Sequence, residues 1–563
     1  MNRNFIPYIY ILFSVFIFQE INGQEIQLKI VAVDTINSSF LKSIEYKKRH
    51  DSEESIQSEI DSISLKLSKI GFLENYIESI HKKDSILTTY FFLGMNTQQI
   101  ILNYSNSDIS LNLLNQLSIS HNQSQFFLTI NQIPNFLNSI VSEYEKRGDS
   151  FIQASLKNIT KSKDGLIADL HIIKSTNRTI DHIIVKGYEK FPQSFIKHYL
   201  NLKIGSVFNT SKLKEVSTSI QSLSFISEIK SPEILFAKDS TTIYLYLQKN
   251  KNNKFDGLIG FSSNESGKLK FNGYLDLSLN NIFNKGESIS VYWKSNGEDR
   301  KFFNVEINTP FIFGSPISPK ATFNIYKQDS TFLNTKANID IIYLFNPKNS
   351  LSVMFQTESS NNLSETFQNS NIETFKNTFY GMSYTFKQPD FQRSFQNKFY
   401  ISISALWGNR TISSNMEKET QSKYEILTYY LWSLNSKNSI FIQNNSGTLL
   451  SNILYTNELY RIGGANSIRG FNEESIFSST FSVMNIEYRY NISPTSYLYS
   501  ITDYAYVQNK VINTNTSLYG FGLGYNYKTK SGLIDISYAL GKQKKTPFDF
   551  NNSKFHIKLT QYF

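Results

Sequence analysis

The residues best suited to specific polar chemistry lie in one glycine-rich segment and at two acidic positions after it. The segment reads Arg461-Ile-Gly-Gly-Ala-Asn-Ser-Ile-Arg-Gly-Phe471, and Glu487 and Asp503 lie in the next two runs of alternating apolar and polar residues. The guanidinium of Arg469 is a rigid fork of N–H donors that can bind a carboxylate through two parallel hydrogen bonds. We therefore predict that the segment folds back onto those runs and that Arg469 pairs with Glu487 or Asp503.

Other groups of residues that carry chemistry cannot be assembled from this sequence. The chain has no cysteine, and its seven histidines are isolated, without a pair at the spacing of metal ligands. Gly520, Gly522 and Gly524 share one face of a strand, which suits close packing, whereas a nucleotide-binding loop needs a helix directly after it. We expect no catalytic residue, metal, cofactor or enzymatic activity. The net charge of +10 comes without a long basic run, so we expect no nucleic-acid partner.

The elements that must position Arg469 are strands. In Lys268–Asn280 and Ile534–Gly541 apolar and polar residues alternate with a period of two, and similar runs recur from 254 to 563. Charged residues make up only 18% of the chain and aromatic residues 15%, whereas soluble domains carry about 25% charged residues. This composition suits a protein with a large surface that faces something other than water.

Short polar turns between these runs alternate with longer connections rich in Asn, Ser and Thr, at 358–375, 410–421 and 449–476. We count sixteen strands, or about 19 residues for each strand and its connection, which is what a membrane-spanning strand of about ten residues requires. Lipid offers no partner to backbone N–H and C=O groups, so such strands must close into a barrel. Glu487 and Asp503 should then point into the lumen. The alternative is a soluble β-sandwich or propeller.

Residues 24–250 mix strands with amphipathic helices. The order β-α-α-β-β recurs about every 75 residues, which divides this region into units at 24–97, 98–176 and 177–250. Residues 1–23 read as a secretory signal peptide, with Arg3 before an apolar run from Phe5 to Phe18. The alternative is a membrane anchor, for which this run is short, because a spanning helix needs about 20 residues.

At this point the sequence resembles a known family. Ser467-Ile-Arg-Gly-Phe471 resembles the sixth-loop signature of the outer-membrane assembly and two-partner secretion transporter superfamily, whose members include BamA, TamA and FhaC. The matching positions are Ile468, Arg469, Gly470 and Phe471. Asn485-Ile-Glu487 and Thr502-Asp503-Tyr504 match the next two strands of the family, whose acids hold the arginine inside the lumen. The chain departs from the family at Tyr504-Ala505, where a small residue followed by Gly is common.

The N-terminal units resemble POTRA domains. The third does so most clearly, through Val185-Lys-Gly187, Gly205-Ser-Val-Phe208 and the strand Thr242–Leu247. Three such units before a sixteen-stranded antiparallel transmembrane barrel are most similar to a TamA-type member, since BamA usually carries five.

The resemblance implies a factor in the outer membrane of a Gram-negative bacterium, with its POTRA domains in the periplasm. Unfolded outer-membrane or secreted clients would add a strand to the POTRA sheet edges and would then enter or cross the membrane. Outer-membrane lipid and a periplasmic or inner-membrane accessory protein are the further partners we expect.

The first and last strands are expected to form a weak seam. Gly257 and Gly260 in the first strand favour weak pairing. The chain ends in a strand whose apolar face forms the other side of the seam and a C-terminal signal. That face comprises Phe555, Ile557, Leu559 and Phe563.

Two alternatives remain open. A two-partner secretion transporter would thread one dedicated substrate through the lumen, but such proteins usually carry two POTRAs, a plug helix and a Pro-rich linker. Here 24–34 reads as a strand, and no proline occurs between Pro7 and Pro134. A passive porin-like barrel with POTRA-like units would not require a buried partner for Arg469.

Overall fold

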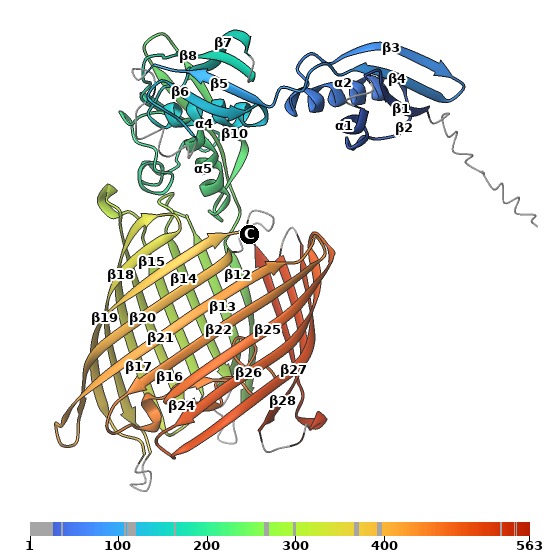
Figure 1. Cartoon of the computed structure of the whole chain (residues 1–563). Helices are drawn as coiled ribbons and strands as arrows, with labels where there is room; N and C mark the ends of the chain where they lie inside the picture. The colour runs from blue at the N-terminus through green and yellow to red at the C-terminus, as the bar shows by residue number, and fades with distance from the viewer. Residues whose placement is uncertain are drawn as a thin grey trace, which may run out of the picture. The chain divides into compact units, whose positions relative to one another are not determined.

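The computed structural model describes residues 26–34, 38–105, 109, 120–162, 165–263, 269–296, 300–364, 371–390, 397–529, 532–544, 547 and 549–562. The predicted signal peptide at 1–23 and the terminal Phe563 lie outside these residues. The chain divides after Asn177 into two compact units, each described by itself (Figure 1). Within the described residues, no helix combines the length and the apolar character needed to cross a membrane.

The first unit begins with a four-stranded sheet in the order β2-β1-β4-β3, with β1 and β4 parallel. Its strands are β1 (Ile26–Ala32), β2 (Arg49–His50), β3 (Tyr76–Lys83) and β4 (Ile86–Phe92), and its helices are α1 (Ser38–Lys42) and α2 (Glu53–Lys69). The side chain of Ser52 caps α2 by accepting the backbone N–H of Ser55 at 3.2 Å. The predicted apolar stripe of α2 is buried and comprises Ile56, Ile60, Ile63 and Leu67.

A second sheet, in the order β6-β5-β8-β7, completes the first unit. Its strands are β5 (Gln99–Asn103), β6 (Gln125–Thr129), β7 (Gln153–Ser162) and β8 (Gly165–Ile173), and its helices are η1 (Ile130–Gln132) and α4 (Ile133–Lys146). Phe136 and Ile140 of α4 are buried against this sheet. The first sheet contains the short strand β2 and the second has β6 before α4, so both differ in detail from the predicted order β-α-α-β-β.

The second unit starts with a three-stranded sheet in the order β10-β11-β9. It comprises β9 (His182–Lys186), the π-helix η2 (Phe195–Tyr199), α5 (Thr210–Gln221), β10 (Ile226–Phe236) and β11 (Thr241–Lys249). Its elements follow the predicted order. Its core includes Phe311 from the barrel, whose ring meets that of Phe195 edge to face with centroids 4.8 Å apart.

Two turns of the barrel hold this third sheet. Tyr188 Oη donates a hydrogen bond to Asn284 Oδ1 at 2.7 Å, and His198 Nε2 donates one to the carbonyl oxygen of Gly314 at 2.7 Å. A Cβ at Gly286 would collide with the ring of Phe195, and Gly286 has a φ of +73°. The third sheet is therefore packed on the turns that join β13 to β14 and β15 to β16.

The rest of the second unit is a closed antiparallel barrel of sixteen described strands, which confirms the predicted fold (Figure 1). In spatial order the strands are β12 (Lys254–Ser263), β13 (Leu269–Asn280), β14 (Ser288–Asn296), β15 (Lys301–Asn308), β16 (Ile317–Gln328), β17 (Phe332–Asn346), β18 (Asn349–Asn362), β19 (Phe375–Pro389), β20 (Asn397–Ile412), β21 (Lys418–Ser433), β22 (Asn438–Leu450), β25 (Thr480–Ser493), β26 (Ser496–Asn509), β27 (Thr514–Lys528), β28 (Gly532–Gln543) and β29 (Lys554–Tyr562). The prediction of a long connection at 410–421 is wrong, because only residues 413–417 separate β20 from β21.

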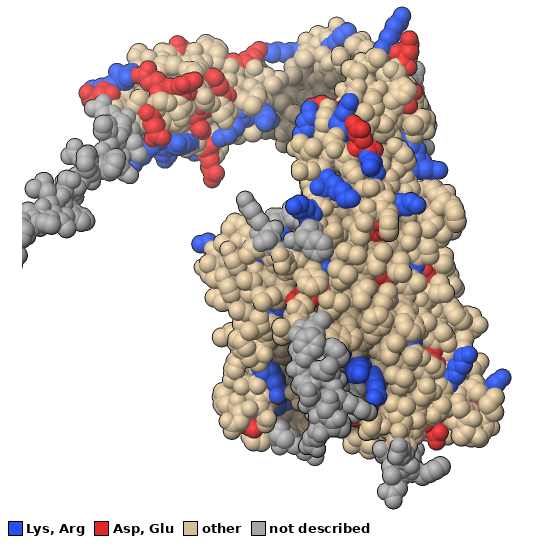
Figure 2. Space-filling model, turned by 180° about the vertical axis from the view of Figure 1, so that it is seen from behind, with Lys and Arg blue, Asp and Glu red and all other residues tan. Residues whose placement is uncertain are grey.

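Side chains alternate between the lumen and the outside. On β25, Met484 and Tyr488 are 39% and 48% exposed, whereas Asn485 and Glu487 between them are buried. On the face seen in Figure 2, charged side chains are sparse along the middle of the barrel wall. This pattern is typical of a barrel whose outer surface faces lipid.

The first unit provides a test of its helix packing. Ile63 of α2 is fully buried and Leu65 of the same helix is 58% exposed. In a fragment of residues 26–177, Ile63→Ala should lower the free energy of unfolding by about 2–5 kcal/mol, because it leaves a cavity. Leu65→Ala should change it by less than about 0.5 kcal/mol. Urea titration followed by circular dichroism measures both, and equal midpoints for the two variants would contradict the packing of α2.

Candidate functional site

The predicted glycine-rich segment belongs to a loop, residues 451–479, that connects β22 to β25 and folds into the lumen. It contains the short helix η4 (Thr456–Glu458) and a hairpin of β23 (Tyr460–Ile462) and β24 (Ile476–Ser478). Ile468 is fully buried and Arg469 is only 7% exposed. We call residues 451–479 the lumen loop.

The structure brings Arg469 together with both acids. Its Nε and Nη2 donate to Asp503 Oδ2 and Oδ1 at 2.9 and 2.7 Å, so the two groups form a bidentate pair. Its Nη1 donates to Glu487 Oε1 at 2.6 Å. The backbone N–H of Arg469 also donates to Asp503 Oδ2, at 2.9 Å. The sequence left the choice between the two carboxylates open, and the arginine in fact uses both.

A second arginine completes this network. Arg489 Nε donates to Glu487 Oε2 at 2.8 Å, so Glu487 lies between two guanidinium groups. Two positive and two negative side chains thus neutralise one another. Because Asp503 is only 1% exposed and Glu487 7%, loss of one partner would leave a buried charge uncompensated.

Glycines on the facing strands let the tip of the lumen loop approach the wall. A Cβ at Gly520 of β27 would collide with the carbonyl oxygen of Arg469, and a Cβ at Gly541 of β28 with that of Gly470. Gly470 itself has a φ of +89°, which side chains disfavour. The predicted close packing at Gly520 therefore has a specific cause, which is contact with the loop backbone.

The apolar residues of the tip form a small core with the wall. Ile468 and Phe471 pack in one cluster with Val483 and Ala505. Ala505, where the family commonly has glycine, is fully buried there. Its methyl group contributes to this cluster while Asp503 still reaches Arg469.

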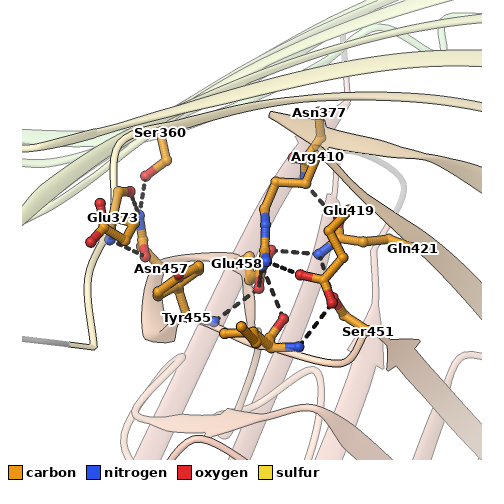
Figure 3. Close-up of polar contacts among 11 residues, drawn as sticks. Ser360, Glu373, Asn377, Arg410, Glu419, Gln421, Ser451, Tyr455, Asn457 and Glu458 are labelled. Atoms are coloured by element: carbon orange, nitrogen blue, oxygen red, sulfur yellow. Dashed lines mark hydrogen bonds and ion pairs between the residues drawn. The ribbon is translucent and has the colours of Figure 1, made fainter. Parts of the chain in front are cut away.

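A second polar cluster, which sequence reasoning missed, binds the beginning of the lumen loop. Arg410 of β20 is fully buried, and its Nη1 donates to Glu458 Oε1 at 2.5 Å and to the carbonyl oxygen of Ile453 at 3.1 Å (Figure 3). Its Nη2 pairs with Glu419 of β21. The guanidinium also lies 4.7 Å from the centre of the Tyr455 ring, within range of a cation–π interaction.

Amide groups extend this cluster across neighbouring strands. Gln421 Nε2 donates to Glu458 Oε2 at 2.9 Å, and Asn457 Nδ2 donates to Ser360 Oγ at 2.6 Å (Figure 3). Asn334 Nδ2 of β17 donates to the carbonyl oxygen of Asn457 at 2.6 Å. Together with the Arg469 network, these contacts fasten the lumen loop to strands from β17 to β28.

The seam between the first and last strands is short. Among the described residues, β12 pairs with β29 only at Lys254↔Tyr562 and Phe255↔Gln561. By contrast, β14 and β15 pair continuously from Ser288↔Asn308 to Ser295↔Lys301.

The predicted seam glycines lie further along β12 than its two residues that pair with β29. Gly257 and Gly260 pair with β13, and no residue of β29 in the described ladder pairs with them. On β29, the predicted apolar residues are more than half exposed. They are Phe555 (62%), Ile557 (57%) and Leu559 (52%).

The described residues contain no group of three His, Asp or Glu side chains that could hold a metal ion. The two polar clusters around Arg469 and Arg410 are ion pairs and amide contacts that fasten one loop. The fold and this site define a closed sixteen-stranded β-barrel that follows N-terminal α+β sheets and holds one loop fastened inside its lumen.

Comparisons with known proteins agree with this class. Residues 178–249 match the POTRA family, described as surface antigen variable number repeat. CdiB from Acinetobacter baumannii has 14% sequence identity and a TM-score of 0.53 over 83% of this chain and 90% of that chain. For CdiB from Escherichia coli the identity is 12% and the TM-score 0.52, over 91% and 97% of the two chains. BamA from Haemophilus ducreyi lacking POTRA domains 1–3 has 13% identity and a TM-score of 0.45, over 83% and 99%.

No curated protein matches the sequence. The two CdiB structures show a common fold, and the third sheet is a POTRA domain. The comparisons thus confirm the predicted fold and the POTRA assignment of residues 178–249, whereas the TamA-type grouping stays a prediction.

The Arg469 network predicts a large effect of a single substitution. Arg469→Ala leaves Asp503 buried without a cation, which should cost about 3–5 kcal/mol. Adding Asp503→Asn should recover part of this loss, because the uncompensated charge is removed. The temperature at which the folded barrel loses its faster mobility on a denaturing gel measures the effect.

The control is Lys320→Ala. It removes an ion pair with Glu306, and the side chains of Lys320 and Glu306 are 30% and 35% exposed. Equal shifts for Arg469→Ala and Lys320→Ala would contradict the network.

The Arg410 cluster predicts a change in the lumen itself. Arg410→Met should release the beginning of the lumen loop and raise the ion conductance of the barrel in a planar bilayer. Glu458→Gln should have the same effect, and the double variant should add little, because both residues belong to one contact. An unchanged conductance in a folded Arg410→Met protein would show that this cluster does not hold the loop.

Proposed function

We propose that this protein is an outer-membrane factor that helps unfolded client proteins enter or cross that membrane, with its POTRA domains on the periplasmic side. The match of residues 178–249 to the POTRA family and the closed sixteen-stranded barrel support this role. Because the number of strands is even, the chain ends on the side of the barrel where β12 begins.

The single observation that carries the proposal is the short seam. After Phe255, the described residues of β12 pair only with β13. Before Gln561, the described residues of β29 pair only with β28. Over this length the two strands leave their facing edges without a partner in the described ladder. Unpaired backbone groups are costly in lipid, where water cannot replace the missing partner. A client strand would satisfy both edges, and separating two paired positions costs little compared with opening a full ladder.

The N-terminal sheets offer the clients a first contact. In the first two sheets, β3 and β7 are edge strands whose residues are largely exposed. An extended client can add to such an edge through its backbone, which gives affinity with little demand on its sequence. We infer that no enzymatic step is involved, because client folding and lipid burial can supply the free energy.

The second candidate is transport of one dedicated substrate through the lumen. The common fold with the two CdiB structures favours it. The lumen loop weighs against it, since two buried clusters would have to break before a chain could pass. A passive porin-like role would leave the buried charge network around Arg469 without a purpose beyond stability.

A cross-link across the seam separates these candidates. Phe255→Cys with Gln561→Cys places two thiols at opposed positions of β12 and β29, and the chain has no cysteine of its own. The oxidised protein in lipid vesicles should fold a small outer-membrane barrel client much more slowly than the reduced protein. The control pair, Val291→Cys with Val305→Cys, links β14 to β15 and should be insensitive to oxidation. Full activity of the oxidised seam variant would exclude lateral insertion and favour passage through the lumen.

A further inference from the structure

The outer wall of the barrel carries a groove on β19, β20 and β21, at the end remote from the third sheet. Its volume is about 650 Å³. The groove lies next to the short turn 413–417, where β20 ends and β21 begins. The groove is distinct from the lumen clusters, because its lining residues alternate with the buried, inward-facing Asn377, Arg410 and Gln421.

The lining residues form rows across the three strands. The register pairs Lys376 with Thr411 and Thr411 with Lys418, which gives a row of two lysines and a hydroxyl nearest the turn. Strand neighbours lie about 4.8 Å apart, so the two lysine Cα atoms are roughly 10 Å apart and their flexible side chains can converge on one anion.

The second and third rows differ in character. Thr378, Asn409 and Thr420 form a row of hydroxyl and amide groups next to the lysines. Beyond it lie Tyr380 and Trp407, which are 64% and 50% exposed. Aromatic side chains of this kind mark the level at which a barrel wall passes from hydrocarbon to the headgroup region.

The two lysines are available to a ligand. Within the described residues, the side chains of Lys376 and Lys418 form no ion pair and no hydrogen bond. Glu417 lies in the turn and is exposed, and no ion pair joins it to either lysine in the described part of the chain. Charge complementarity therefore favours an anionic occupant.

We propose that this groove binds the phosphorylated sugar headgroup of a lipid in the outward-facing leaflet. The lysines would pair with phosphate, the hydroxyl and amide row would bind sugar hydroxyl groups, and Tyr380 and Trp407 would contact the sugar face and the start of the acyl chains. A free phosphate would use the first row alone, whereas a lipid headgroup uses all three. The inference rests on the outer-membrane location proposed above and is independent of any client.

The test measures lipid binding by the purified full-length protein in detergent, with native mass spectrometry as the readout. The probes are bisphosphorylated lipid A and its chemically dephosphorylated form. Lys376→Gln with Lys418→Gln should weaken binding of the phosphorylated probe by about tenfold, because two charge-assisted contacts are lost. Binding of the dephosphorylated probe should stay unchanged. Lys376→Arg with Lys418→Arg should retain binding of the phosphorylated probe.

The matched control is Lys348→Gln with Lys437→Gln, which makes the same change in net charge at exposed turns on the opposite end of the barrel. It should leave binding of both probes intact. If the double groove variant fails to fold, the single variants are measured, each with an expected loss of about threefold.

Equal binding by the wild-type protein and the groove variant would overturn the proposal, and so would an equal loss in the control. Displacement of the lipid by millimolar inorganic phosphate alone would assign the lysines to a free anion and would also overturn it. Because no client enters the assay, these outcomes are independent of the seam cross-link. The failure of either proposal can thus be told from failure of the other.

Discussion

The constraint on which this structure depends is that backbone groups in lipid must find partners within the protein. It explains why the strands close into a ring and why outward-facing side chains are apolar along the middle of the wall. It also gives the seam its meaning. A ladder that stops after Phe255↔Gln561 leaves two strand edges that water would tolerate and hydrocarbon would not. The weakest part of the ring is therefore also the part with the greatest capacity to accept another strand.

The lumen loop stabilises the ring over the strands from β17 to β28. Arg469 binds its tip to β25 and β26, Gly520 and Gly541 let that tip touch β27 and β28, and Arg410 binds its beginning to β20 and β21. Each arginine is buried with two carboxylates, so neither contact can be removed without leaving a charge behind. The ring is thus held firmly where the loop crosses it.

Much of this arrangement could be predicted from the sequence. Alternation with a period of two located the strands and placed Glu487 and Asp503 in the lumen. The resemblance of the loop motif to the sixth-loop signature implied their contact with Arg469. The Arg410 cluster could not be found in the same way. Near the turn at 413–417 the outward residues Asn409 and Thr411 are polar like the inward ones, so the alternation disappears. The inward position of Arg410 follows only if β20 is extended to Ile412. The extent of the seam is a tertiary property that strand patterns do not encode.

The packing of the third sheet on the barrel has a mechanical consequence. Phe195 and Tyr188 are fitted against the turn that contains Asn284 and Gly286, and this turn ends β13, the immediate neighbour of the seam strand β12. A force applied to the POTRA domain is thereby transmitted to β13, next to the seam between β12 and β29. The same joint that anchors this domain can act as a lever, with the β13–β14 turn as its fulcrum.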